Sequence, residues 1–145
     1  LWYWICKKTI RKVAKSRKNI YFIFLGTNPF IKSTIFRPHP NIIFLPANVD
    51  INFKVRFINT CDAYLHARKQ GESFGLSIRE FSIKNKPIII WFKSEEKSHL
   101  QILGNKAILY ENFHDLFTIL TTFTPSNAPG WDCYSEIFSP TRVME

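Results

Sequence analysis

The candidate chemistry of this sequence is concentrated in residues 66–80, where two glycines and two glutamates lie close together. A glycine lets the backbone approach a ligand where a side chain would block it. Amides at the start of a helix attract phosphate, and a carboxylate accepts hydrogen bonds from vicinal hydroxyls. The segment therefore predicts a site for an activated sugar. Its expected groups are Glu72 at sugar hydroxyls, Glu80 about two helical turns further on at ribose hydroxyls, and the backbone amides of Phe74, Gly75 and Leu76 at phosphate.

Each of these residues also has a structural explanation. Glu72 could be a charge favoured near the start of a helix. Glu80 could pair with Arg79 or Lys84, and Gly75 could be a packing glycine. Spacing alone supports the two interpretations equally.

The flanking sequence alternates apolar runs with helical patterns. Runs that are apolar on both faces are typical of parallel strands covered by helices, and the expected strands are 20–25, 42–45, 62–66, 87–91 and 106–110. Apolar residues at helical spacing follow Asp50 and Asn112, which predicts a helix after each. A third helix is expected at 76–83, and a fourth ends before Gly104. We therefore expect an α/β fold with a doubly wound, mostly parallel Rossmann-like sheet of at least four strands. In such a sheet, ligands bind at the carboxyl ends of the strands.

The segment from Glu72 to Trp91 resembles the E-x7-E signature of retaining GT-B glycosyltransferases of the group 1, or family 4, type. The usual form is E-G-F-G-L-P-x-x-E, followed by a proline and an apolar strand. The matching residues here are Glu72, Phe74, Gly75, Leu76, Glu80 and Pro87. The preceding run 61–66 resembles the strand before that signature, and a looser similarity extends from roughly residue 7 to residue 123.

This resemblance implies one half of a GT-B fold and transfer of a sugar from a nucleoside-diphosphate sugar to an unknown acceptor, with retention. It assigns a catalytic contact with the donor sugar to Glu72 and the ribose to Glu80. The other expected substrate-binding residues are Arg68, Gly71, Ser73, Phe74, Gly75 and Leu76. No metal or cofactor is expected, because backbone dipoles and cations stabilise the leaving phosphate. The acceptor could be a glycan, a lipid or a protein.

The sequence departs from the family pattern at several positions. After the leucine, the family has a small residue and a proline, and this sequence has Ser77-Ile78. Before the later proline, the family has a glycine, and this sequence has Asn85-Lys86. Residues 66–68 replace the usual Pro-Ser, so Arg68 is either a cation adapted to the donor or a surface residue. The family's Gly-Arg loop with its nearby lysine is absent, and residues 1–5 are either part of a helix or a strand. A catalytically incomplete glycosyltransferase fragment is therefore an alternative.

The resemblance divides the chain into two segments. Residues 1–123 are the expected nucleotide-sugar-binding domain, truncated at its N-terminus. Residues 124–145 contain Pro and Gly and are typical of a connector, followed by the start of a C-terminal helix at Ser139-Pro140.

The formal net charge of +9 favours an anionic partner. Much of the charge lies in 7–18, which predicts a solvated helix face or, less commonly, contact with an acidic membrane surface or the donor phosphates. A nucleic-acid-binding module is the alternative function. We disfavour nucleic acid as a partner because the aromatic residues fall mainly on expected buried faces. A dehydrogenase is excluded by the absence of G-x-G-x-x-G.

The three cysteines are unevenly spaced and form no CxxC pair, and the four histidines do not cluster at metal-ligand spacing. We therefore interpret the thiols as small apolar groups and the histidines as structural or surface residues. No apolar run reaches the roughly 18 residues that cross a bilayer. The expected location is the cytoplasm, or the periphery of a membrane.

Overall fold

The computed structural model describes residues 2–29, 39–71 and 74–139. Helices alternate with short parallel strands, which confirms the α/β class. The chain divides into two compact units. The first unit comprises Leu1–Lys54 and Asn112–Phe123, and the second comprises Val55–Glu111 and Thr124–Glu145.

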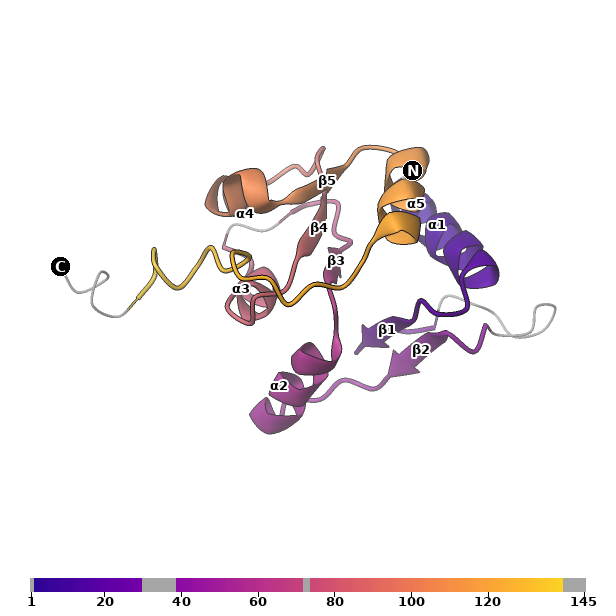
Figure 1. Cartoon of the computed structure of the whole chain (residues 1–145), viewed down its shortest axis with the longest axis horizontal. Coiled ribbons are helices and arrows are strands. Elements are labelled where there is room, and N and C mark those ends of the chain that lie inside the picture. Colours follow the sequence, from indigo (N-terminus) through magenta and orange to yellow (C-terminus); the bar gives the residue numbers. More distant parts are fainter. Residues whose placement is uncertain (1, 30–38, 72–73, 140–145) are drawn as a thin grey trace. The chain divides into compact units, whose positions relative to one another are not determined.

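The first unit pairs two helices from opposite ends of the sequence with a two-stranded sheet (Figure 1). Helix α1 (Trp2–Ser16) packs against α5 (Phe113–Thr122). Strands β1 (Phe22–Leu25) and β2 (Ile42–Leu45) are parallel and in register along their whole length. The buried residues of the two helices include Ile5, Ile10, Val13, Ala14, Leu116 and Leu120. They recur at helical spacing, so each helix turns one apolar stripe to the interior.

Asn41 fixes the end of α1. Its side chain is almost fully buried, and its Nδ2 donates to the carbonyls of Ala14, Arg17 and Ile20 over 3.1, 3.2 and 2.9 Å. The last carbonyls of a helix have no partner within it. Asn41 supplies partners there and joins the helix end to the start of β2.

The second unit is built on a three-stranded sheet. Its strands are β3 (Tyr64–His66), β4 (Ile88–Trp91) and β5 (Ile108–Tyr110), in the order β3-β4-β5 and all parallel. Helix α3 (Leu76–Ser82) connects β3 to β4. Helix α4 (Ser98–Leu103) and a 3-10 turn (Gly104–Lys106) connect β4 to β5. The core of this unit contains Ile58, Ile78, Phe81, Ile88, Ile90, Leu103 and Tyr134.

Helix α2 (Ile51–Thr60) contains the boundary between the units, which falls after Lys54. Asp50 caps it as expected, because its Oδ1 accepts from the backbone N–H of Phe53 at 2.6 Å. Its residue Ile58 belongs to the core of the second unit. None of the helices in the described part of the chain is long and apolar enough to span a bilayer.

The observed strands all fall within the expected ranges, but they form two sheets instead of one sheet of at least four strands. Among the described residues, the ladder hydrogen bonds join β1 to β2 and β3 to β4 to β5. The alternative that residues 1–5 form a strand is wrong for residues 2–5, which begin α1. Ile5 lies on the same buried face as Thr9 and Val13, and this spacing follows the helical period.

Candidate functional site

The carboxyl ends of β3, β4 and β5 meet at one edge of the parallel sheet, at His66, Trp91 and Tyr110. Two turns cover this edge, residues 67–71 after β3 and residues 92–97 after β4. Ligands of open α/β sheets bind at this edge. We call residues 67–71 and 92–97, together with α3, the candidate site.

Backbone hydrogen bonds hold the two turns together. The N–H of Glu95 donates to the carbonyl of Lys69 at 3.2 Å, and the N–H of Glu96 donates to the carbonyl of Gln70 at 2.7 Å. Gly71 and Glu96 then form a parallel bridge. An exposed ion pair joins Lys69 Nζ to Glu95 Oε1 over 3.3 Å. The turn after β3 is therefore fixed by the turn after β4.

Gly71 is required by this pairing. It is buried with φ of +74°, where side chains are strained. A Cβ there would overlap the carbonyl of Glu96 and lie 3.0 Å from Cε1 of His99. The backbone of residue 96 therefore occupies the space beside Gly71, and the substrate-binding role expected of Gly71 stays a prediction.

Glu72 and Ser73 lie outside the described residues. The catalytic contact expected of Glu72 and the binding role expected of Ser73 stay predictions.

Phe74 and Gly75 lead into α3 and are held from the C-terminal segment. The ring of Phe74 packs edge-on against Tyr134 and Phe138, with centroids 5.7 and 4.9 Å away. The Tyr134 hydroxyl donates to the Phe74 carbonyl at 2.9 Å. Gly75 is buried in the left-handed conformation, φ 74° and ψ 67°, and is the residue from which α3 begins. The sequence therefore places glycine where another residue would be strained.

Helix α3 starts at Leu76, so Glu80 lies one turn into it and not about two turns. The difference arises because Gly75, with its left-handed backbone, cannot belong to the helix. Leu76 is 67% exposed and Glu80 is half-buried. Residues four apart lie on one helix face, so Leu76 and Glu80 share a face of α3.

Two contacts from β3 hold α3 in place. The ring of Tyr64 stacks on that of Phe81 with centroids 4.4 Å apart. The hydroxyls of Tyr64 and Ser77 are 3.1 Å apart and hydrogen-bonded. On the other side of the helix start, the guanidinium of Arg79 lies 5.9 Å from the centre of the Phe74 ring. The helix that carries Glu80 is therefore anchored at its first turn and at its end.

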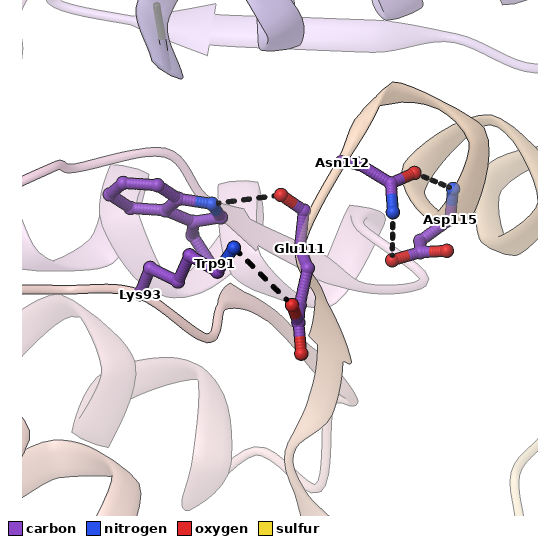
Figure 2. Close-up of polar contacts among 5 residues, drawn as sticks. All are labelled: Trp91, Lys93, Glu111, Asn112 and Asp115. Carbon is purple, nitrogen blue, oxygen red and sulfur yellow. Dashed lines mark hydrogen bonds and ion pairs between the residues drawn. The ribbon is translucent and has the colours of Figure 1, made fainter.

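Charged side chains surround the edge. Arg68 is exposed in the first turn. Figure 2 shows the end of β4, where Lys93 Nζ pairs with Glu111 Oε2 over 3.5 Å and Trp91 Nε1 donates to the Glu111 carbonyl over 3.4 Å. The same figure shows the cap of α5, where Asn112 Oδ1 accepts from the N–H of Asp115 at 3.0 Å.

The carboxylate of Glu96 organises the start of α4. Its Oε1 accepts from the Ser98 hydroxyl at 2.7 Å and from the backbone N–H groups of Ser98 and Lys97 at 2.9 and 2.8 Å. These bonds, the Ser98 hydroxyl first, lower the pKa of Glu96. The backbone of Glu96 therefore holds the turn 67–71, and its side chain holds the start of α4. Glu96 was not predicted as a site residue from the sequence. The signal that could have found it is an acidic residue two positions before Ser98, at the start of a helix.

Two histidines meet beneath the turns. His66 ends β3 and His99 lies in α4, both are buried, and their ring centroids are 5.3 Å apart. Of the two alternatives expected from the sequence, structural or surface residues, this burial favours the first for His66 and His99. Their proximity could not be expected from their spacing in the chain. In the part of the chain that the structure describes, no group of three or more His, Cys, Asp or Glu could hold a metal ion.

A shallow depression of about 110 Å³ lies elsewhere, among Asp62, Lys84, Asn85, Lys86, Pro125, Ser126 and Asn127. Asp62 and Lys86 precede β3 and β4, so the depression is at the amino ends of the strands. This is the opposite edge from the candidate site.

No protein-family model, curated protein or solved structure matches this chain. The functional assignment therefore rests on the residues of the candidate site and on their arrangement.

Proposed function

We propose that the candidate site binds the nucleoside-diphosphate sugar of a retaining glycosyltransferase. The observation that carries the proposal is the order of elements around residues 66–80. A parallel strand ends at His66, the turn 67–71 with its positive-φ Gly71 follows, and a helix bearing Glu80 begins directly after Gly75, which also has a positive φ. This is the strand–turn–helix context that the E-x7-E resemblance requires.

The roles of the residues follow from their chemistry. Glu80 accepts hydrogen bonds from the two ribose hydroxyls, because a carboxylate offers an acceptor to each. Leu76, on the same face and exposed, contacts the apolar side of the nucleoside. Arg68 adds positive charge for the diphosphate at the same edge.

In the proposed reaction the bond between the anomeric carbon and the phosphate oxygen breaks. The acceptor hydroxyl passes its proton to the leaving diphosphate oxygen, and its own oxygen bonds to that carbon on the same face of the sugar. The negative charge of the leaving diphosphate is stabilised by cations and backbone dipoles. Glu72, predicted to contact the sugar, would act on transfer more than on nucleotide binding.

The test is calorimetric titration of the chain with UDP, GDP and ADP. We expect Glu80→Ala to weaken binding of the preferred nucleotide by about 1–3 kcal/mol, the usual cost of losing charge-assisted hydrogen bonds. Glu72→Ala should barely change it, because the nucleoside diphosphate alone has no donor sugar. Glu136→Ala, which removes an exposed carboxylate from the C-terminal segment, is the matched control.

Two results would contradict the proposal. One is that the unmodified chain binds none of the three nucleotides. The other is that Glu80→Ala binds the preferred nucleotide as tightly as the Glu136→Ala control does.

A further inference from the structure

Helix α1 exposes a continuous positive surface. Lys8, Arg11, Lys12 and Lys15 are all exposed and follow the spacing of one helix face. We call these four residues the basic face. Helix α1 contains no Asp or Glu to offset them. The opposite side of the helix, with Ile10 and Val13, is buried.

Aromatic rings lie beside the basic face. Lys8 Nζ is 4.4 Å from the centre of the Trp4 ring and 5.2 Å from that of Phe113 in α5. Lys12 Nζ is 5.3 Å from the Phe113 ring and 5.1 Å from that of Phe117. The side chain of Trp4 is 56% exposed. The surface therefore combines ammonium groups with an exposed indole.

The charge of the whole chain is concentrated in the same unit. By sequence, the first unit holds ten Lys and Arg against two Asp, a formal net of +8. The second unit holds the other ten Lys and Arg against nine Asp and Glu, a net of +1. The candidate site for a phosphate ligand therefore lies in the nearly neutral unit, and most of the excess positive charge belongs to the other unit.

We propose that the basic face of α1 docks the protein on an anionic lipid surface. Clusters of Lys and Arg on a helix are attracted to acidic headgroups. An exposed Trp is suited to the interface, where one end of its ring is wet and the other apolar. Because the apolar side of α1 is already buried, the helix adsorbs through its charges and does not insert.

Nucleic acid is the competing anion, and the geometry disfavours it. Single-stranded nucleic acids bind through aromatic faces on which bases stack. Here the ammonium groups of Lys8 and Lys12 lie over the rings of Phe113 and Phe117. Phe113 and Phe117 are also half-buried, so of the three rings beside the basic face only Trp4 is exposed, and a single ring does not provide a platform for successive bases. Lipid docking is a separate property from donor binding and does not depend on it.

The experiment is co-sedimentation of the full chain with vesicles of phosphatidylcholine alone or mixed with phosphatidylserine. The test variant is Arg11→Glu with Lys15→Glu, which leaves the lysines over the rings unchanged. The matched control is Lys84→Glu with Lys106→Glu, two exposed residues of the second unit with the same change in charge. Circular dichroism checks the fold of each, and Arg11→Gln with Lys15→Gln replaces the test variant if it does not fold.

We expect binding only to the mixed vesicles, weakened by added salt. The Glu variant should reduce the partition constant about 25-fold or more, since each basic residue near an acidic surface contributes roughly fivefold. The control should change it much less. Equal loss in both variants, or no binding to mixed vesicles, would overturn the proposal. Binding to single-stranded RNA without binding to vesicles would also overturn it, and would assign the face to nucleic acid.

Discussion

At the scale of single residues, the glycines separate what the sequence could predict from what it could not. Gly75 was expected beside a helix start, and it has the left-handed backbone that the position requires. Gly71 was expected to bind substrate, and the structure shows a separate need for glycine there, because the carbonyl of Glu96 lies where a Cβ would be. Local spacing predicts a turn that needs glycine. It does not identify a backbone neighbour that lies many residues further along the chain.

Gly71 therefore provides a direct stability test. We expect Gly71→Ala to lower the free energy of unfolding by at least about 2 kcal/mol, because a left-handed backbone costs roughly 1–2 kcal/mol with a side chain and the Cβ also displaces the Glu96 carbonyl. Gly26→Ala is the control, since its φ of +71° is similar and its nearest neighbour is the Ala47 Cβ at 3.2 Å. Denaturant unfolding measures both. An equal loss for the two variants would show that the bridge to Glu96 adds nothing.

The histidines and Glu96 show the same limit. The buried pair of His66 and His99 brings together two elements separated by α3 and β4. Nothing in the sequence around either histidine indicates that the other is its neighbour. The E-x7-E residues could be singled out because they lie within nine consecutive positions of the sequence, whereas the groups that pack around this segment come from distant positions.

At the scale of elements, the sequence predicted most of the helices and strands because their signals are local. Asp50 and Asn112 accept the backbone hydrogen bonds of helix caps. The apolar runs became β1 to β5, each slightly shorter than expected or of equal length. The division into two sheets was not predicted, because the pairing of strands depends on contacts between distant segments.

The segment after α5, which was predicted to be a connector, is hydrogen-bonded to residues at the end of α3. Asn85 Oδ1 accepts from the N–H groups of Gly130 and Trp131 at 3.1 and 2.8 Å, and its Nδ2 donates to the Ala128 carbonyl at 2.9 Å. The Ser82 hydroxyl donates to the Trp131 carbonyl at 2.9 Å and accepts from the Cys133 N–H at 3.0 Å. The end of α3 thus holds this segment. The helix expected from Ser139-Pro140 falls on positions 140–145, which lie outside the described residues, so it stays a prediction.

Asn85 is the residue through which this attachment can be tested. It has a φ of +56°, so glycine there relieves the backbone while removing the side-chain bonds. We expect Asn85→Gly to cost about 1–3 kcal/mol for three hydrogen bonds, and Asn85→Ala about 1 kcal/mol more. Denaturant unfolding gives the stabilities, and amide exchange at Gly130 and Trp131 reports on the segment. Unchanged exchange at both amides would show that Asn85 does not hold the segment.

At the scale of the whole molecule, four side chains of the second unit, Cys61, Glu96, Asp132 and Cys133, have shifted pKa values. Burial raises the pKa of Cys61, against the opposing charge of Lys86, and burial also raises the pKa of Cys133. Burial alone would raise the pKa of Asp132. Hydrogen bonds from Ser135 and Tyr134 outweigh this effect, so the pKa of Asp132 is lowered overall. Glu96 is also lowered. These four groups should therefore contribute to the pH dependence of stability.

The sign of each contribution follows from proton binding. A thiol with a raised folded pKa stabilises the fold below the unfolded pKa, and that contribution is lost as pH rises above roughly 8.5. A carboxylate with a lowered folded pKa stabilises the fold above the unfolded pKa, and that contribution is lost as pH falls below roughly 4. We expect the melting temperature to fall in both windows.

The alkaline fall is the sharper test, measured by thermal melts from about pH 7 to 9.5, below the range in which Tyr and Lys titrate. Replacing Cys61 and Cys133 with Ala should flatten it, whereas Glu136→Ala, which leaves both thiols in place, is the control and should keep the alkaline fall. If the double variant keeps the full alkaline loss, the thiols are not its cause.

The pairing of α1 with α5 has a consequence for the order in which the protein is made. Almost a hundred residues separate the end of α1 at Ser16 from the start of α5 at Phe113. At a synthesis rate of about 5–20 residues per second, this delay is on the order of 5–20 s. All three strands of the β3–β5 sheet leave the ribosome before α5 does. During this delay the apolar stripe of α1 cannot pack against α5, so it is exposed to solvent and to chaperones until α5 emerges.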